Sequence, residues 1–166
     1  MGRRIAFGGL SFALALVTGL PAAARAADWA GISPGTSTVE TVRQRYGAPS
    51  RETRQKVEGY DTIRWIYEGT RTPPGMKRMT VEFGLLAPGG FRANVVRYFV
   101  LEPKPGVFER RTIVNGWDVP DGIGEEGGRK VFFYKAGLKV TFDENEDNAL
   151  SMVFTIPQPA PTPTAK

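Results

Sequence analysis

The sequence predicts an α+β fold of two tandem repeats, each a short helix followed by a three-stranded antiparallel meander, with the helices on one face of the sheet. Two observations support this. The segment 37–49, STVETVRQRYGAP, has a counterpart in 112–121, TIVNGWDVPD, and the matching residues, from Thr41 and Thr112 to Pro49 and Pro120, are 71 positions apart. Each copy is followed by segments in which aromatic and β-branched residues alternate with polar ones, a pattern typical of half-buried strands. We expect repeats over 27–101 and 102–156 that share one sheet or pack closely; the alternative is a β-sandwich in which the repeat is fortuitous.

The first repeat begins with a short helix that has its own start and stop signals. Ser37 and Glu40 fit the S-x-x-E capping box, in which each side chain satisfies an unpaired amide at the helix start. Val42 and Tyr46 belong to an apolar stripe at helical spacing. Gly47 then stands where a residue with positive φ commonly ends a helix. The sequence therefore predicts a helix that ends before Gly47.

Strands are expected wherever polar and apolar residues alternate between glycine- and proline-rich turns. In the second repeat the helix is less regular, because Asn115 and Gly116 interrupt its last turn. The segment 50–59 is polar and carries Arg51, Arg54 and Lys56, and the glycine-rich segment 122–127 is interpreted as a loop or hairpin turn. The expected strands are 60–67, 77–83, 94–101, 130–134, 138–142 and 150–156.

Both ends of the chain have compositions unlike the rest. Residues 1–26 read as a secretory signal peptide: two arginines, an apolar run of 16 residues and the small-residue pattern Ala24-Arg25-Ala26. We expect a periplasmic or secreted protein without stable membrane insertion after cleavage. An uncleaved anchor is the alternative, although the run is shorter than the about 20 residues that span a bilayer. Residues 157–166, PQPAPTPTAK, are expected to be a disordered Pro-rich tail.

Charge and cysteine content exclude several classes of protein. Without Arg3, Arg4 and Arg25 the 22 basic residues fall to 19 against 17 acidic ones, a net charge of +2. No dense basic stripe then remains, so a nucleic-acid partner is not expected. The chain has no cysteine, so it has neither disulfides nor a thiol for lipid attachment, and its stability must come from its core.

The first repeat resembles the BamE (SmpA/OmlA) family of lipoproteins and the related β-lactamase-inhibitor-like module. The resemblance covers about residues 32–101: a helix ending in Y-G-A-P, then W-I-Y, then M-T-V-E-F, a glycine turn and a closing strand. It departs from the family in lacking the lipid-bearing cysteine and in having Asp118 where the second copy should have glycine. It implies a non-enzymatic protein-binding role in the cell envelope, with an assembly or inhibitor-like function and another envelope protein as partner. The matching residues are Gly47, Pro49, Trp65, Tyr67, Val81 and Phe83.

Histidine and cysteine are both absent, which removes most nucleophilic, thiol and zinc chemistry. We therefore expect no enzyme, no cofactor and no metal centre. The alternative from another class is a small carboxylate-dependent hydrolase acting on envelope glycans, which needs two acids about 5 to 9.5 Å apart. Its candidate acids lie in one glycine-rich segment: Asp118, Asp121, Glu125 and Glu126.

Two further motifs are weak. The segment 122–127 fits G-x-G-x-x-G but lacks the preceding strand and following helix of a dinucleotide site, so we interpret it as a loop or hairpin turn. Asp143, Asn145 and Asp147 have the spacing of the start of a calcium loop, but Asn148 and Phe154 stand where glycine and glutamate are required. A weak calcium site in a strand turn is left open.

One surface is a candidate for partner binding. Tyr60, Arg64, Tyr67 and Arg97 combine aromatic and arginine side chains, the types that anchor protein interfaces. If the meander buries only one face, Trp65 and Tyr67 belong to the core instead, and we favour the core for Trp65.

Overall fold

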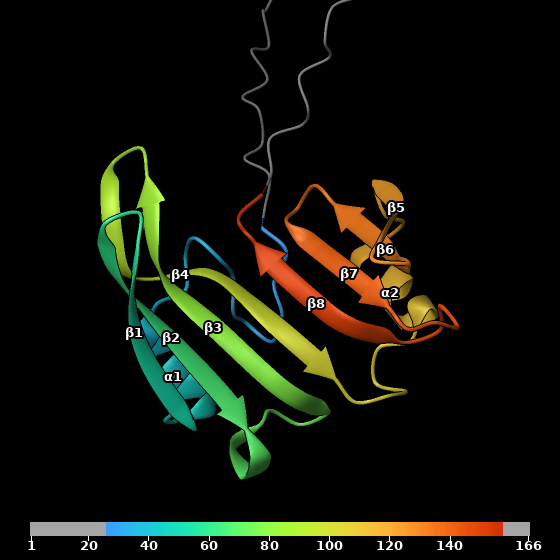
Figure 1. The fold of residues 1–166 in the computed structure, drawn as a ribbon, viewed down its shortest axis with the longest axis horizontal. Helices are drawn as coiled ribbons and strands as arrows, with labels where there is room; N and C mark the ends of the chain where they lie inside the picture. Colours follow the sequence, from blue (N-terminus) through green and yellow to red (C-terminus); the bar gives the residue numbers. More distant parts are fainter. Residues whose placement is uncertain (1–25, 158–166) are drawn as a thin grey trace, which may run out of the picture.

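The computed structural model describes residues 26–157, which form a single antiparallel sheet of eight strands in the order β1-β2-β3-β4-β8-β7-β6-β5 (Figure 1). The signal peptide and the tail expected from the sequence lie outside the described residues, apart from Ala26 and Pro157. Among the described residues, no helix is long and apolar enough to cross a membrane. The elements are α1 (Val39–Tyr46), β1 (Arg51–Val57), β2 (Tyr60–Glu68), the 3-10 turn η1 (Gly69–Arg71), β3 (Met76–Ala87), β4 (Gly90–Pro103), α2 (Arg110–Trp117), β5 (Gly122–Glu126), β6 (Arg129–Tyr134), β7 (Leu138–Phe142) and β8 (Ala149–Thr155).

The expected α+β fold of two helix-and-three-strand repeats is wrong. Of the described residues 26–157, 53% lie in strands and only 14% in helices, and the strands form one eight-stranded sheet. The six strands expected from alternation are confirmed, but the sequence does not predict β1 or β5 as strands. β1 is an outer strand, RETRQKV, most of whose side chains are exposed, so it has no apolar alternation. β5 is the other outer strand, and its sequence GIGEE looks like a turn. Outer strands are often polar, which removes the pattern that identifies inner ones.

The first helix begins one residue later than its expected cap. Thr38 is the cap residue, and it forms a capping box with Thr41 in place of the Ser37–Glu40 pair. Ser37 is already engaged, because its hydroxyl oxygen accepts a hydrogen bond from the Ser33 N–H at 2.9 Å. Gly47 ends the helix with φ +73°, as expected.

Both helices lie against the same face of the sheet, and the core is the layer between the helices and the sheet. Figure 1 shows α1 behind β1 and β2. Tyr46 of α1 packs edge-on against Tyr67 with ring centroids 6.1 Å apart, and Trp117 of α2 packs against Phe154 at 5.9 Å. The buried side chains of this layer include Trp65, Tyr67, Val81, Phe83, Phe99, Leu101, Val140 and Phe154. We call the opposite face of the sheet the open face, since neither helix covers it.

The second helix ends in a strained residue. Asp118 has φ +71° and ψ −173°, close to the φ +73° and ψ −159° of Gly47 at the end of α1. This region of backbone conformation is nearly restricted to glycine. The Asp118 carboxylate accepts a hydrogen bond from the next N–H, that of Val119, at 2.8 Å, which offsets part of the cost.

We therefore expect Asp118→Gly to raise the free energy of unfolding by about 1 kcal/mol, because glycine adopts this conformation without a steric penalty. Urea unfolding followed by circular dichroism measures the change. The control is Glu58→Gly, which changes another non-glycine residue of positive φ, +52°, in the turn between β1 and β2. A loss of stability in Asp118→Gly would show that the Asp118 hydrogen bond outweighs the strain.

Candidate functional site

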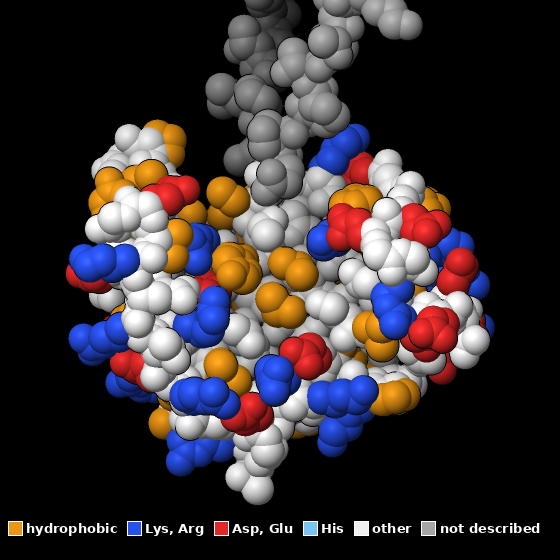
Figure 2. Space-filling model, viewed as in Figure 1, with side chains coloured by type: hydrophobic (Ala, Val, Ile, Leu, Met, Phe, Trp, Pro, Cys, Tyr) orange, Lys and Arg blue, Asp and Glu red, His pale blue; other side chains and the backbone are white. Residues whose placement is uncertain are grey.

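The open face carries a mixed set of charged, aromatic and aliphatic side chains. Figure 2 views this face and shows hydrophobic side chains in its middle with lysines and arginines around them. The strand register defines two rows across it. In one row Arg64 is paired with Glu82, and Glu82 with Tyr98. The other row runs through Thr80, Val100, Val153, Lys139, Phe133 and Gly122.

Glu82 is a carboxylate buried in the middle of this face, with only 1% of its side chain exposed. One carboxylate oxygen contacts Nε of Arg64. The other accepts a hydrogen bond from Nε2 of Gln55 at 3.0 Å and lies 3.5 Å from Nη2 of Arg97. Burying a charged group is costly unless it is paired and hydrogen-bonded, so these three side chains offset the cost of burying the Glu82 carboxylate.

Arg97 reaches Glu82 because of a β-bulge. Between Glu82 and Phe83 the partner on β4 changes from Tyr98 to Val96, so Arg97 is an extra residue in that strand. A bulge of this kind redirects a side chain. Val96 and Phe99, which flank Arg97 and Tyr98 in β4, are both fully buried in the core. Arg97 lies on the open face, on the same side of the sheet as Glu82.

The two positive charges of Arg64 and Arg97 exceed the single negative charge of Glu82 between them. Hydrogen bonding to Glu82 raises the pKa of Arg64 above its usual value and keeps the guanidinium charged. The Arg97 guanidinium lies 5.2 Å from the centre of the Tyr98 ring, a cation–π contact. Its Nε is buried and has no hydrogen-bond partner among the described residues. The cluster of Arg64, Glu82 and Arg97 therefore presents a net positive charge held in a fixed position.

A small pocket adjoins this cluster where the β1–β2 and β3–β4 hairpins meet. We call it the hairpin pocket; its volume is about 260 Å³, and Arg97 is part of its wall. Tyr60 stacks on Phe91 with ring centroids 4.5 Å apart, and both line it. Leu86, another wall residue, is 50% exposed. The pocket therefore combines apolar walls with one cationic group.

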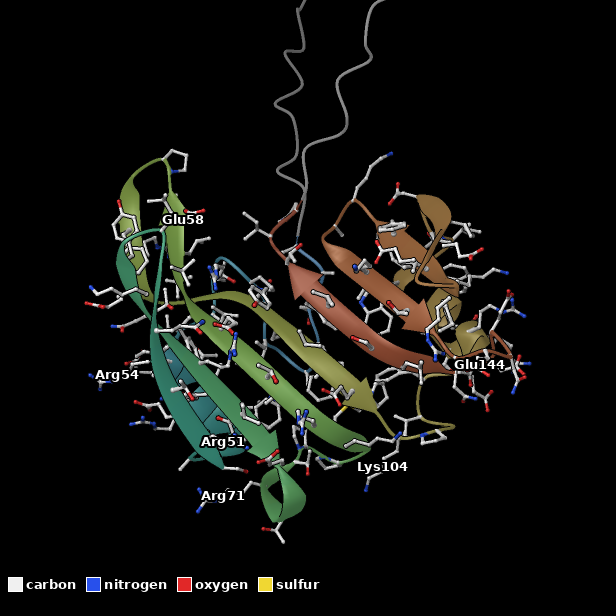
Figure 3. The ribbon with its side chains drawn as sticks, in the orientation of Figure 1. Arg51, Arg54, Glu58, Arg71, Lys104 and Glu144 are labelled. Atoms are coloured by element: carbon white, nitrogen blue, oxygen red, sulfur yellow. The ribbon has the colours of Figure 1, made fainter. Side chains whose placement is uncertain are left out.

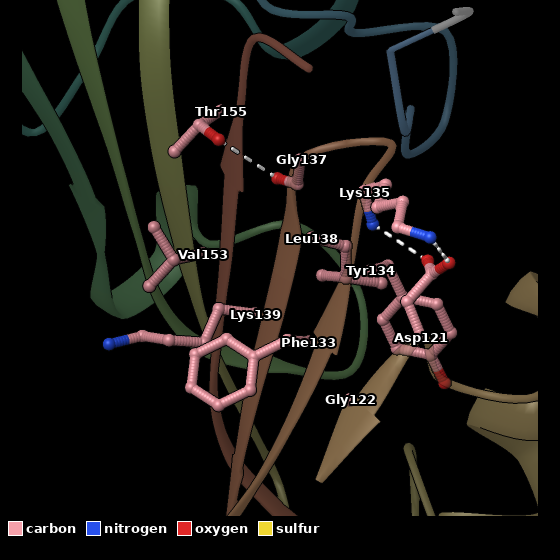
Figure 4. Close-up of a pocket in the computed structure, with 10 residues that line it drawn as sticks. All are labelled: Asp121, Gly122, Phe133, Tyr134, Lys135, Gly137, Leu138, Lys139, Val153 and Thr155. Carbon is pink, nitrogen blue, oxygen red and sulfur yellow. Dashed lines mark hydrogen bonds and ion pairs between the residues drawn. The ribbon is translucent and has the colours of Figure 1, made fainter. Parts of the chain in front are cut away.

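A larger hollow of about 570 Å³ lies over β6–β8 on the other half of the sheet (Figure 4). Phe133 and Val153 line it together with the stem of Lys139. At its margin the Lys135 N–H and ammonium group bind the Asp121 carboxylate at 2.8 and 3.2 Å, and these contacts lower the pKa of Asp121.

The structure brings together three of the four residues expected in a partner-binding surface. Arg64 and Arg97 share Glu82, and Tyr60, 39% exposed, lines the hairpin pocket beside Arg97. Tyr67 lies apart from them: it is fully buried on the helix-covered face, and its hydroxyl donates a hydrogen bond to the Gly47 carbonyl at 3.1 Å. Burial raises the pKa of Tyr67 to about 12. Trp65 is in the core, as favoured from the sequence.

Glu82 is the central residue that the sequence did not indicate. In M-T-V-E-F it alternates with Val81 and Phe83, and a polar residue in that position ordinarily faces water. Its burial comes from Gln55 and Arg97, which are distant from it in the sequence. The one sign of the bulge that brings Arg97 there is the adjacent polar pair Arg97–Tyr98, which stands between two apolar residues of β4.

The acids considered for hydrolysis are engaged separately. Asp121 is bound by Lys135, and Glu126 pairs with Lys139 at 2.8 Å. Glu125 and Glu126 are consecutive residues of β5, so their side chains point to opposite faces. The lowered pKa of Asp121 disfavours a role as proton donor at neutral pH.

The two weak motifs have structural roles in the fold. The G-x-G-x-x-G segment contains β5 and enters the β5–β6 turn. In the candidate calcium turn, the Asp143 carboxylate accepts hydrogen bonds from the Asp147 and Asn148 N–H groups and from the Asn148 side chain. Across residues 26–157, no three acidic side chains gather in a way that would hold a metal ion.

Comparison with known proteins gives one distant structural similarity. No family model and no curated protein matches the sequence. A DUF4309 family protein (YjgB) from Bacillus subtilis subsp. subtilis strain 168 is similar with 9% identity and a TM-score of 0.48, over 76% of this chain and 83% of that one. This similarity is too distant to indicate a family or a function.

Proposed function

We propose that this chain is a non-enzymatic protein-binding module of the cell envelope, and that the open face around Arg64, Glu82 and Arg97 is its binding surface. The observation that supports this most directly is the burial of Glu82 between two arginines on the face that no helix covers. Exposure of one face is ordinary for an antiparallel sheet, so exposure alone would not favour binding.

The arrangement of the arginines gives this face the properties of an interface. Arginine and tyrosine are enriched among the residues that contribute most to binding. A side chain that is already held in place loses less conformational entropy when a partner binds. Glu82 fixes Arg64 and Arg97 in this way, and Tyr98 and Val153 supply neighbouring surface that a partner would cover.

The export part of the proposal is based on residues 1–26, whose pattern is that of a secretory signal. The protein would then work in the periplasm or outside the cell, with another envelope protein as its partner. The BamE-like pattern in residues 32–101 agrees with an assembly or inhibitor-like role. Glycan hydrolysis is not favoured, because two of the four candidate acids, Asp121 and Glu126, are paired with separate lysines.

Capture from an envelope extract tests the proposal. Mature protein beginning at Ala27 is immobilised, crosslinked to an extract and analysed by mass spectrometry, in parallel with two variants. Val153→Glu places a charge in the middle of the open face. Ile123→Glu makes the same kind of change on the outer strand β5, at a site that is 64% exposed. Ile123 is paired with Phe132, so it lies on the helix-covered side of the sheet and outside the open face.

We expect one dominant stoichiometric partner with wild type and with Ile123→Glu, and at least a tenfold loss with Val153→Glu, since charges are disfavoured at the centre of an interface. Circular dichroism verifies that both variants are folded. The proposal fails if no partner is captured, or if both variants capture it equally well.

A further inference from the structure

We infer that the hairpin pocket anchors a partner segment in which one large apolar side chain stands next to a carboxylate, and that Arg97 receives the carboxylate. This inference rests on the proposed function, because it assumes that the occupant belongs to a polypeptide. It goes further by stating the chemistry of the residues that the pocket selects.

The polar half of the inference comes from the hydrogen bonds of Arg97. Its Nη2 makes a long contact of 3.5 Å with Glu82, and its Nε is buried with no acceptor within residues 26–157. Buried donors in proteins are nearly always paired, so the unpaired Nε shows that the hydrogen bonds of Arg97 are incomplete among the described residues. The 26% of the Arg97 side chain that is exposed is the part that an acceptor in the pocket can contact. Glu82 is already occupied by Arg64 and Gln55, which leaves the second positive charge only partly compensated. A carboxylate matches a guanidinium in both charge and geometry.

The apolar half comes from the other walls. The stacked rings of Tyr60 and Phe91 form one side, and the exposed Leu86 belongs to the neighbouring β3–β4 hairpin. Gly84 allows this arrangement, because a Cβ there would lie 2.9 Å from Cγ2 of Thr62 and 3.0 Å from Cζ of Phe91. The absence of a side chain at Gly84 thus lets the Phe91 ring lie close to the sheet.

The size of the pocket favours a side chain over a free small molecule. Its volume of about 260 Å³ is below the roughly 300–1,000 Å³ typical of small-molecule sites. The adjoining open face supplies the further contact area that a protein partner needs. The pocket also has one opposing charge, Glu58, at the tip of the β1–β2 hairpin (Figure 3). Its removal should therefore strengthen binding of an acidic segment.

Two capped peptides test this directly: acetyl-Gly-Phe-Glu-Gly-amide and the same peptide with glutamine in place of glutamate. Each is titrated into ¹⁵N-labelled mature protein, and the Nε–H resonance of Arg97 is followed by NMR. We expect millimolar binding of the glutamate peptide with a shift of that resonance, and at least tenfold weaker binding of the glutamine peptide. Glu58→Gln should bind the glutamate peptide about twofold more tightly, since a nearby like charge is removed.

Two variants address the two halves of the pocket. Arg97→Lys keeps a positive charge but loses Nε, and Leu86→Asp changes an exposed wall residue, so its fold is maintained. Both should bind the glutamate peptide at least tenfold more weakly than wild type. Equal binding of the two peptides, no shift of the Arg97 resonance, or unchanged binding by Leu86→Asp would overturn the inference. These outcomes leave capture of the whole partner unaffected, so failure of the pocket is distinguishable from failure of the binding function.

Discussion

Replacing Gly137 with alanine is expected to lower the free energy of unfolding by about 3 kcal/mol or more, because both the backbone angle and the available space exclude a side chain. Gly137 has φ +93° in the turn between β6 and β7. A Cβ there would lie 2.3 Å from the Thr155 carbonyl oxygen and 2.8 Å from that of Ile156. A side chain could relieve such a contact by changing its rotamer, but these are backbone atoms, so the end of β8 would have to move.

The movement would also break interactions that hold the turn in place. The Thr155 N–H donates to the Gly137 carbonyl at 2.7 Å, and the Ala27 N–H donates to the neighbouring Ala136 carbonyl at 2.7 Å. Gly59→Ala is the matched control, because Gly59 has a similar φ of +85° but no atom within 4 Å of the added Cβ. It should cost only about 1 kcal/mol. Urea unfolding of both variants measures the difference, and equal losses would show that the contact with Thr155 is relieved without cost.

Glu82→Gln is expected to destabilise the protein by about 3 kcal/mol. Removing one partner of a buried ion pair leaves the other charge without compensation, and the loss is then large. Here two cations would remain beside a neutral amide, and the side chains of Arg64 and Arg97 are only 39% and 26% exposed. Glutamine keeps the size of the side chain, so the change in stability reports the charge.

The control for Glu82 is Glu68→Gln on the same strand pair. Glu68 also contacts two arginines, Arg51 at 2.7 Å and Arg78 at 3.4 Å, but at the surface, where ion pairs contribute little. Chemical unfolding in 0.1 and 1 M NaCl compares them. The loss in Glu82→Gln should persist at both salt concentrations, since a buried pair is poorly screened. A loss no greater than that of Glu68→Gln would contradict the central role of Glu82.

The inner strands were predictable from the sequence, but the sheet as a whole was not. Trp65, Val81 and Phe83 alternate with polar neighbours, and such local alternation located six strands. The pairing of β4 with β8 joins residues more than 50 positions apart and leaves no local signal. Without it, and without the polar outer strands β1 and β5, the sequence suggests two three-stranded meanders that share a sheet or pack closely, and not one continuous sheet of eight strands.

The candidate site was also predictable only in part, because local sequence pattern shows some of its residues and not the long-range contacts between them. Arg64 and Arg97 are conspicuous in the sequence because they interrupt aromatic strands, and they do lie together. Tyr67 was placed with them because an aromatic residue in a strand can face either side, and only the position of α1 decides that it is buried. The resemblance to BamE-like proteins and the binding role remain predictions that capture experiments will decide.

The position of β8 has a consequence for how the chain reaches its native state. This strand follows all the others in the sequence, yet it lies between β4 and β7 in the interior of the sheet. Until it is inserted, both of its neighbours have unpaired backbone groups along one side, and Phe99 lacks the ring of Phe154 that stacks on it at 4.5 Å. Folding of the sheet is therefore delayed until synthesis of the strands is complete. The eight-stranded sheet is therefore incomplete until its last strand is present, a property compatible with the export proposed above.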